Sequence, residues 1–303
     1  MKQWRRRLRA QVLGALFALA GLLPLSFALA LGAWLGGLAF GVLRGERHKA
    51  LRHLAIAFPE KSHAERRRLG RESFAQLGRS ALELAQFRKL DLATYVDWPA
   101  EQISLVRAAL SQGRGGTLVF GHLGNWELVG PRFVAAGFGG VAIGRESGDP
   151  FLAKRIAAAR RALGVPVVPR GTDGTASAGG QAVREILRAL KAGKFVAVLL
   201  DQDTRVDSVF VPFFGRLAHT PRAAEDLVRL SRGCCVLAFI HRKPGGGHLL
   251  TTEVVDAAAP ELTARLTRRI EAELRAYPSE WVWMHERWKR RPPEPSEGSA
   301  PTP

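Results

Sequence analysis

The spacing of hydrophobic and polar positions divides the chain into three regions with different predicted structure. An uncharged stretch of 34 residues runs from Ala10 to Leu43. Residues 44–90 then place apolar side chains at helical spacing on one face, with Arg and Glu on the other, which predicts helices. From residue 115, short apolar runs such as "TLVF" and "FVAVLL" alternate with helical stretches such as "QAVREILRALKAG". This alternation predicts an α/β fold with a mainly parallel central sheet flanked by helices.

The predicted strands share a polar end. Five apolar runs are each followed by ionisable residues, which are Gly121-His122, Arg145-Glu146, Arg170-Gly171, Asp201-Gln202-Asp203 and His241-Arg242-Lys243. In open parallel sheets, ligands bind outside the carboxyl ends of the strands, so these residues are expected to converge on one edge. The later stretch "EWVWMHERWKRRP" alternates tryptophan with other residues and predicts an edge strand.

The uncharged N-terminal segment is too long for a secretory signal, whose apolar core has roughly 7–15 residues. As one straight helix it would measure about 51 Å, against roughly 30 Å of bilayer hydrocarbon. Pro24 and Gly36-Gly37 are candidate breaks, and both flanks are basic. We therefore expect a membrane helix or helical hairpin with both ends on the cytoplasmic side, a single span being the alternative. The expected division is an anchor (1–43), a catalytic domain (44–291) and a disordered proline-rich tail (292–303).

The charge of the chain narrows the choice of partners. The net charge is +18, and residues 1–90 carry 17 Lys and Arg against 5 Asp and Glu, which is +12 of that total. Such asymmetry favours an anionic partner, either nucleic acid, acidic lipid or an acidic carrier protein. A long uncharged segment and the lack of a recognisable nucleic-acid module argue against nucleic acid. The adjacent Cys234 and Cys235 are expected to be reduced core residues.

The stretch "GHLGNWE" contains the best candidate for chemistry. Asn125 is a suitable N-cap, so Glu127 would lie in the first turn of a helix, where its charge is favourable on electrostatic grounds alone. The chemical interpretation has Glu127 turn back to accept a hydrogen bond from His122, leaving the other ring nitrogen as a base. A metallohydrolase built from His122, Glu127, Asp201 and Asp203 is the alternative, but the paired histidines of usual metal sites are missing.

Four segments together resemble a known family. "GHLGNWE", "HLAIAFPEKSHAERRRLGRESFAQLGRSALELA", "LLDQDTRVDSVFVPFFGRLAHTP" and "YPSEWVWMHERWKRRP" are similar, in the same order, to the bacterial lipid A biosynthesis (lauroyl/myristoyl) acyltransferase family, which is lysophospholipid acyltransferase-like. With the hydrophobic N-terminus, the resemblance covers most of residues 10–292. One departure is His53, where family members often carry Asn.

The resemblance implies roles for individual residues. His122 would deprotonate an acceptor hydroxyl that attacks an acyl thioester, and Glu127 would orient the histidine, with no metal, cofactor or covalent acyl-enzyme. The substrate-binding candidates are Arg145, for a phosphate or oxyanion, Asn125, Arg170, Asp201 and Asp203. For the two aspartates the resemblance favours structural or substrate-positioning work. Phe210, Phe213 and Phe214 are candidates for an acyl channel, with aromatic core as the commoner explanation.

The resemblance implies a lipid A precursor or similar membrane glycolipid as the acceptor. The strongly basic chain favours acidic acyl carrier protein as the donor. The basic flanks and the reduced cysteines favour the cytoplasmic face of the inner membrane, where basic residues such as Arg287, Lys289, Arg290 and Arg291 are expected to meet anionic lipids. An acyl-coenzyme A-dependent enzyme acting on a mannosylated phosphatidylinositol-like lipid is one alternative. A non-catalytic lipid-binding membrane protein is a more distant one, which would not need His122 and Glu127.

Overall fold

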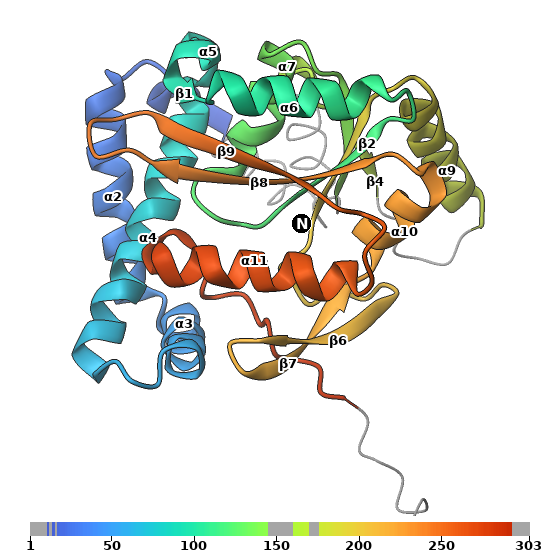
Figure 1. Cartoon of the computed structure of the whole chain (residues 1–303). Coiled ribbons are helices and arrows are strands. Elements are labelled where there is room, and N and C mark those ends of the chain that lie inside the picture. The colour runs from blue at the N-terminus through green and yellow to red at the C-terminus, as the bar shows by residue number, and fades with distance from the viewer. Residues whose placement is uncertain (1–10, 12–13, 16, 145–159, 170–175, 293–303) are drawn as a thin grey trace, which may run out of the picture.

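A seven-stranded sheet forms the centre of the computed structural model, which describes residues 11, 14–15, 17–144, 160–169 and 176–292 (Figure 1). In spatial order the strands are β1 (Val96–Asp97), β9 (His248–Val255), β8 (Cys234–Arg242), β2 (Gly116–Phe120), β5 (Phe195–Leu199), β3 (Gly140–Gly144) and β4 (Val167–Pro169). Every neighbouring pair is parallel except β8 and β9, which are antiparallel. The predicted mainly parallel sheet with flanking helices is confirmed.

Helices cover both faces of this sheet, so its central strands are buried on both sides. Along β2, Leu118 packs in one apolar cluster and its neighbour Val119 packs in the other, as alternation along a strand requires. One face is covered by α6 (Ala100–Ser111), η2 (Trp126–Leu128) and α7 (Val129–Ala135). The other face is covered by α9 (Ala176–Lys191), α10 (Ala223–Ser231) and α11 (Leu262–Ala276).

Residues 44–90 are helical, as the polar and apolar spacing there predicts. They form α3 (Arg44–Ala57), α4 (His63–Gln86) and the short η1 (Phe87–Lys89), and α5 (Leu92–Tyr95) follows. The uncharged N-terminal segment contributes α2 (Leu25–Val42). A capping box fixes the start of α4: Ser62 accepts from the backbone of Glu65, and the Glu65 carboxylate accepts from the backbone of Ser62. Helix α4 also reaches the C-terminal segment, where the Ser73 hydroxyl donates to the Trp281 carbonyl.

The N-terminal hydrophobic segment is interrupted where one of the two predicted breaks lies. Pro24 is the N-cap of α2, in agreement with a break there, since proline has no N–H to offer a preceding turn. Gly36-Gly37 was predicted as a second break, but α2 continues through it to Val42. The reason is tertiary: Gly36 is buried against α4, so the glycine serves close packing of two helices.

The segment "EWVWMHERW" is not the predicted edge strand. The chain forms η3 (Pro278–Glu280) and then irregular backbone whose one bridge joins Trp281 to Leu123. Trp281 and Trp283 are buried in the core, so the alternation of tryptophans records burial without a strand. A separate antiparallel hairpin, β6 (Ser208–Phe213) and β7 (Arg216–Pro221), lies beneath α11 in Figure 1.

Candidate active site

The residues that follow β2 are held by close backbone packing at the carboxyl edge of the sheet. Gly124 has φ +59°, and a Cβ there would lie 2.0 Å from the Ile240 carbonyl oxygen, so only glycine fits. Its N–H donates to the Glu280 carbonyl at 2.9 Å. These contacts fix the backbone near His122, which lies two residues after the end of β2.

Asp201, which follows β5, binds His122 twice. The Asp201 carboxylate lies 2.7 Å from His122 Nδ1 through Oδ1 and accepts from the His122 backbone N–H at 2.7 Å through Oδ2. Trp281 Nε1 also donates to Oδ2, at 2.6 Å. Because β2 and β5 are parallel neighbours, their carboxyl ends bring these two residues together, as the pattern of polar strand ends predicts.

The Asp201 carboxylate is charged although it is buried. Burial alone raises its pKa, but the charge and hydrogen bonds of His122 and the Trp281 donor outweigh burial and lower the pKa to about 2. A carboxylate only accepts, so the proton between the two groups lies on His122 Nδ1. In the neutral ring the remaining nitrogen, Nε2, carries the lone pair that a general base needs.

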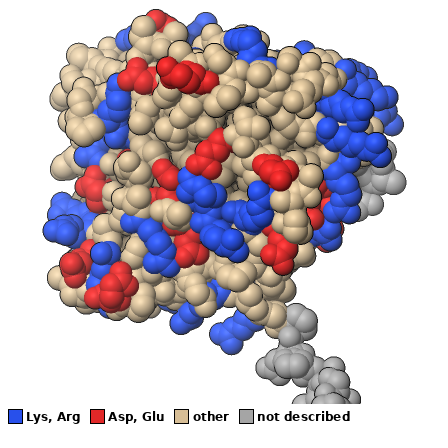
Figure 2. All heavy atoms as spheres, viewed as in Figure 1, with Lys and Arg blue, Asp and Glu red and all other residues tan. Residues whose placement is uncertain are grey.

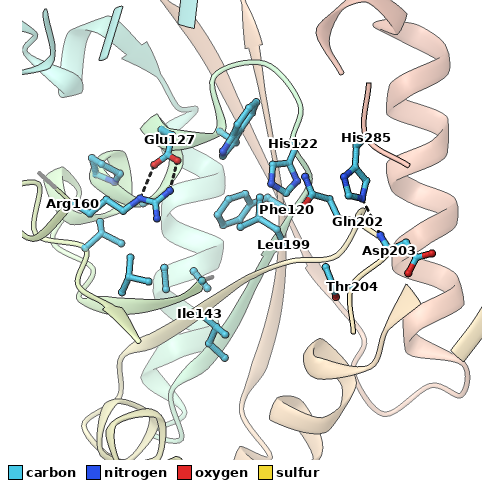
Figure 3. Close-up of a pocket in the computed structure, with 18 of the residues that line it drawn as sticks. Phe120, His122, Glu127, Ile143, Arg160, Leu199, Gln202, Asp203, Thr204 and His285 are labelled. Atoms are coloured by element: carbon cyan, nitrogen blue, oxygen red, sulfur yellow. Dashed lines mark hydrogen bonds and ion pairs between the residues drawn. The ribbon is translucent and has the colours of Figure 1, made fainter. Parts of the chain in front are cut away.

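Glu127 has a different partner from the predicted one. It lies in η2, and its carboxylate accepts from Arg160 Nε at 3.1 Å and Arg160 Nη2 at 2.5 Å, as Figure 3 shows. The expected hydrogen bond from His122 to Glu127 is replaced by the bond to Asp201. The physical reason is that the turn through η2 directs Glu127 along the cavity wall toward Arg160, while Asp201 lies directly beside the ring.

Asn125 also differs from expectation, because it is buried away from the cavity. Its side chain makes no cap hydrogen bond to η2 and donates instead to Glu83 of α4 at 2.6 Å. Glu83 is buried as well, and it binds both terminal nitrogens of Arg242 at 2.9 Å, His248 Nε2 at 3.0 Å and the Tyr95 hydroxyl. Burial alone raises the pKa of Glu83, but the hydrogen bonds from His248 and Arg242 lower it overall. Asn125 therefore ties the loop after His122 to α4.

Asp203 and His285 form a second polar group in the cavity. The Asp203 backbone N–H donates to His285 Nε2 at 3.2 Å, so Nε2 is an acceptor and the proton of the neutral ring lies on Nδ1. Burial is the main cause that lowers the pKa of His285 to about 4, against the opposing charge of Asp201. The Asp203 carboxylate pairs with Arg290.

These groups line a cavity of about 780 Å³, within the roughly 300–1,000 Å³ typical of ligand pockets. One part of its wall is apolar and includes Phe120, Ala142, Ile143, Leu163, Val165, Val167, Ala197 and Leu199. The polar part includes His122, Glu127, Asp203 and His285, and the basic side chains are Arg160, Arg205, Lys289 and Arg290. Figure 3 shows His122 and the Glu127–Arg160 pair on the wall of this cavity.

Several other predicted residues lie elsewhere. Arg145 and Arg170 fall outside the described residues. Phe213 and Phe214 are buried in the core and do not line the cavity, and Arg287, expected to meet lipid headgroups, is fully buried and donates to the His219 carbonyl. His53 is buried, with Nδ1 2.8 Å from the Trp283 carbonyl oxygen.

Sequence reasoning missed Arg160 and His285 as cavity residues. Arg160 follows no strand and matches no motif, so nothing in its neighbourhood singles it out. His285 lies in the segment interpreted as an edge strand, although a histidine inside a tryptophan-rich buried stretch was a usable signal.

The sequence is similar to those of known bacterial acyltransferases. The family described as "Bacterial lipid A biosynthesis acyltransferase" matches residues 4–290. The lipid A biosynthesis lauroyltransferase of Escherichia coli is 27% identical over 288 residues, which cover 89% of this chain and 88% of that protein. The palmitoleoyltransferase of the same organism is 27% identical over 270 residues, or 86% and 85% of the two chains. A phosphatidylinositol mannoside acyltransferase of Mycobacterium tuberculosis is 23% identical over 222 residues, or 72% and 68%.

Proposed function

The chain belongs to the bacterial lipid A biosynthesis acyltransferase family and is an O-acyltransferase, and from this premise we propose its reaction. It moves a fatty acyl chain from an acyl thioester, carried by acyl carrier protein, to a hydroxyl of a lipid A precursor or a similar glycolipid. His122 is the general base. The observation that carries the proposal is the charged, buried Asp201 at His122 Nδ1, which leaves Nε2 free to accept a proton in the cavity.

The proposed reaction uses one histidine in two steps. His122 Nε2 takes the proton of the acceptor hydroxyl as its oxygen bonds to the thioester carbonyl carbon, giving a tetrahedral oxyanion. The carbon–sulfur bond then breaks, the ester forms, and the imidazolium returns its proton to the leaving thiolate. Asp201 stabilises the imidazolium between these steps through its negative charge. His285 lines the same cavity and carries its proton on Nδ1, and we assign it the donation of a hydrogen bond to the oxyanion.

The two kinds of cavity wall suit the two parts of the substrates. The apolar wall over β3, β4 and β5 receives the acyl chain, because burying its apolar surface away from water lowers the free energy of binding. The basic side chains suit phosphate groups, which both a phosphorylated glycolipid and a phosphopantetheine arm carry. Glu127 holds Arg160 in place by a bidentate pair, so its proposed role is to position a substrate-binding arginine.

Charge supports a carrier protein as the donor. The chain carries +18 at neutral pH, and Figure 2 shows Lys and Arg gathered over α9, where Arg184, Arg188 and Lys191 are exposed. Acidic carrier proteins would be steered to such a surface. Coenzyme A is the alternative donor, and a mannosylated phosphatidylinositol-like acceptor is the alternative substrate, for which the similarity to the mycobacterial enzyme is the supporting observation.

The proposed location is the cytoplasmic side of the inner membrane. One described helix, Leu25–Val42, is long and apolar enough by composition to enter a membrane. The free Cys234 and Cys235 and the basic flanks of the N-terminal segment support the cytoplasmic side.

The decisive experiment is the replacement of His122. Purified His122→Ala protein, assayed with acyl carrier protein donor and lipid acceptor in mixed micelles, is expected to lose about 10²–10⁴-fold in kcat. His48→Ala, on the outer surface of α3, is the matched control and should retain full activity. Near-normal transfer by folded His122→Ala protein would remove the basis of the proposal.

A further inference from the structure

Helix α2 has two faces of opposite character. Ala28, Gly32, Gly36 and Phe40 recur every four residues and are buried. On the other side, Phe27, Trp34, Leu38 and Val42 expose 56%, 64%, 49% and 66% of their surfaces. A large exposed apolar face on a helix marks a contact with an apolar partner.

The buried face brings the backbones of α2 and α4 into contact. A Cβ on Gly32 would lie 2.4 Å from the Gly78 carbonyl oxygen, and one on Gly36 would lie 2.0 Å from the Phe74 carbonyl oxygen. At the other end of the contact, Gln86 of α4 donates to the Ala20 and Leu23 carbonyls, which closes the turn before α2. Helix α2 is therefore fastened to the folded body along its length, as the left side of Figure 1 shows.

The part of α4 beside the middle of α2 carries charges. Arg71 lies against Gly37, where a Cβ would be 3.5 Å from the guanidinium Nε. The next residue, Glu72, forms an ion pair of 2.7 Å with Arg79, about two turns further along α4. If α2 crossed a bilayer while packed in this way, these three ionised side chains would lie at the depth of the hydrocarbon, which is strongly unfavourable.

We propose that α2 lies in the plane of the membrane interface, with its exposed apolar face against an anionic lipid bilayer, and does not cross it. The inference rests on the proposed function in so far as a membrane glycolipid is the acceptor. Arg67 and Arg71 are exposed on α4 and lie against Phe40 and Gly37 of α2, so their charges suit anionic headgroups at this surface. The chain segments before and after α2 are then on the same side of the membrane.

This arrangement brings the active site close to the lipid. Helix α4 crosses the carboxyl edge of the sheet, where Glu83 binds both Asn125, in the loop after β2, and Arg242 at the end of β8. The bilayer contact and His122 are therefore on the same side of the sheet, separated by the α4 layer.

Depth measurements separate the two orientations. Single cysteines replace Phe27, Trp34 and Val42 in a Cys234→Ala chain, each carries an environment-sensitive fluorophore, and lipid-borne quenchers at known depths report its position in phosphatidylglycerol–phosphatidylethanolamine vesicles. Cys235 can remain, because burial raises its pKa to about 12 and keeps it unreactive. An in-plane helix predicts one shallow depth, about 5–10 Å below the headgroups, at all three positions. A spanning helix predicts that position 34 lies near the bilayer centre, about 11 Å deeper than positions 27 and 42, and that result would overturn the inference.

A label that no lipid quencher reaches would equally overturn it, and would mean that a second copy of the chain or another protein covers the face. Sedimentation of the unlabelled protein distinguishes these two occupants. The depth measurement requires no turnover, so it can succeed or fail independently of the proposed reaction.

A matched pair of glycine substitutions tests the α2–α4 contact itself. Gly36→Leu must separate the two helices, whereas Gly41→Leu, on the same helix, meets open space. We expect Gly36→Leu to lower Tm and vesicle-dependent activity, and Gly41→Leu to change neither. Equal behaviour of the two variants would show that α2 detaches from α4 in the membrane, which contradicts the in-plane arrangement.

Discussion

At the scale of single residues, the position of one proton defines the site. Asp201 remains charged in a buried position because three donors converge on it: His122 Nδ1, the His122 backbone N–H and Trp281 Nε1. That charge fixes which nitrogen of His122 is basic. Asp201 thus determines the tautomer of His122, the proposed base, while Glu127 pairs with Arg160.

The role of Asp201 predicts a large effect of an isosteric change. Asp201→Asn keeps the volume but removes the charge and offers an N–H where the ring needs an acceptor, which favours the wrong tautomer of His122. We expect kcat to fall by about 10²–10⁴-fold, with KM for the lipid acceptor little changed. Steady-state kinetics on protein with an unchanged circular dichroism spectrum provides the measurement. A kcat close to that of the parent protein would contradict the proposed role.

Glu127→Gln is predicted to affect binding more than turnover. The amide retains one hydrogen bond to Arg160 but loses the bidentate ion pair, so the guanidinium is less well placed. We expect KM to rise about tenfold, the equivalent of ~1.4 kcal/mol, and kcat to fall less than in His122→Ala. Glu72→Gln, which weakens a similar pair with Arg79 outside the cavity, is the control. A loss in kcat as large as that of His122→Ala would contradict this role and would show that Glu127 takes part in the chemical step.

At the scale of elements, buried polar side chains hold the loop after β2, which carries the proposed base His122, against its neighbours. Helix α4 contributes Glu83, and the ends of β8 and β9 contribute Arg242 and His248. Nearby, His241 of β8 lies between two carboxylates, with Nε2 3.0 Å from Glu273 of α11 and Nδ1 3.1 Å from Glu280 of η3. The Glu280 backbone in turn receives the Gly124 N–H of the catalytic loop.

The His241 pair predicts a pH dependence of stability. Burial lowers the pKa of His241, but the hydrogen bonds and charges of Glu273 and Glu280 raise it overall above its usual value. A raised folded-state pKa stabilises the folded protein fully below the unfolded pKa of about 6.5, and this contribution is lost as pH rises through the folded pKa. We therefore expect the difference in unfolding free energy between the parent and His241→Gln to be larger at low than at high pH.

Urea denaturation between about pH 6 and pH 9 measures this difference. His285, whose pKa is lowered to about 4, contributes in a separate window below pH 6.5, because its stabilisation is lost as pH falls. The comparison of parent and variant at each pH cancels that contribution. A difference that does not change with pH would show that His241 stays in one protonation state throughout.

At the scale of the whole molecule, the excess of positive charge governs encounter with the donor. We expect kcat/KM for an acyl carrier protein donor to fall steeply as salt rises from about 50 to 500 mM, because screening shortens the range of steering. Arg184 and Arg188 are both exposed on α9. The double variant Arg184→Glu, Arg188→Glu should therefore raise KM for the carrier donor and leave kcat unchanged. If kcat/KM with the carrier donor does not change with salt, and acyl-coenzyme A is used efficiently, coenzyme A would be favoured as the natural donor.

The sequence by itself determined the parts of this protein that depend on local pattern. Apolar runs separated by helical spacing specified the mainly parallel sheet and its helices, and the polar strand ends placed His122 and Asp201 on one edge, because parallel neighbours end on the same side. Motif order along the chain was sufficient to indicate the family.

Only the tertiary structure decided which side chains meet. The partner of His122 is Asp201, 79 residues away, and not Glu127, five residues away. Spacing along the chain does not encode the direction in which a turn such as η2 points a side chain. For the same reason, local sequence cannot show that Gly36 packs against α4 instead of breaking α2, or that the tryptophans around His285 are buried without forming a strand. Local periodicity records burial, whereas contacts between distant segments depend on how the elements pack.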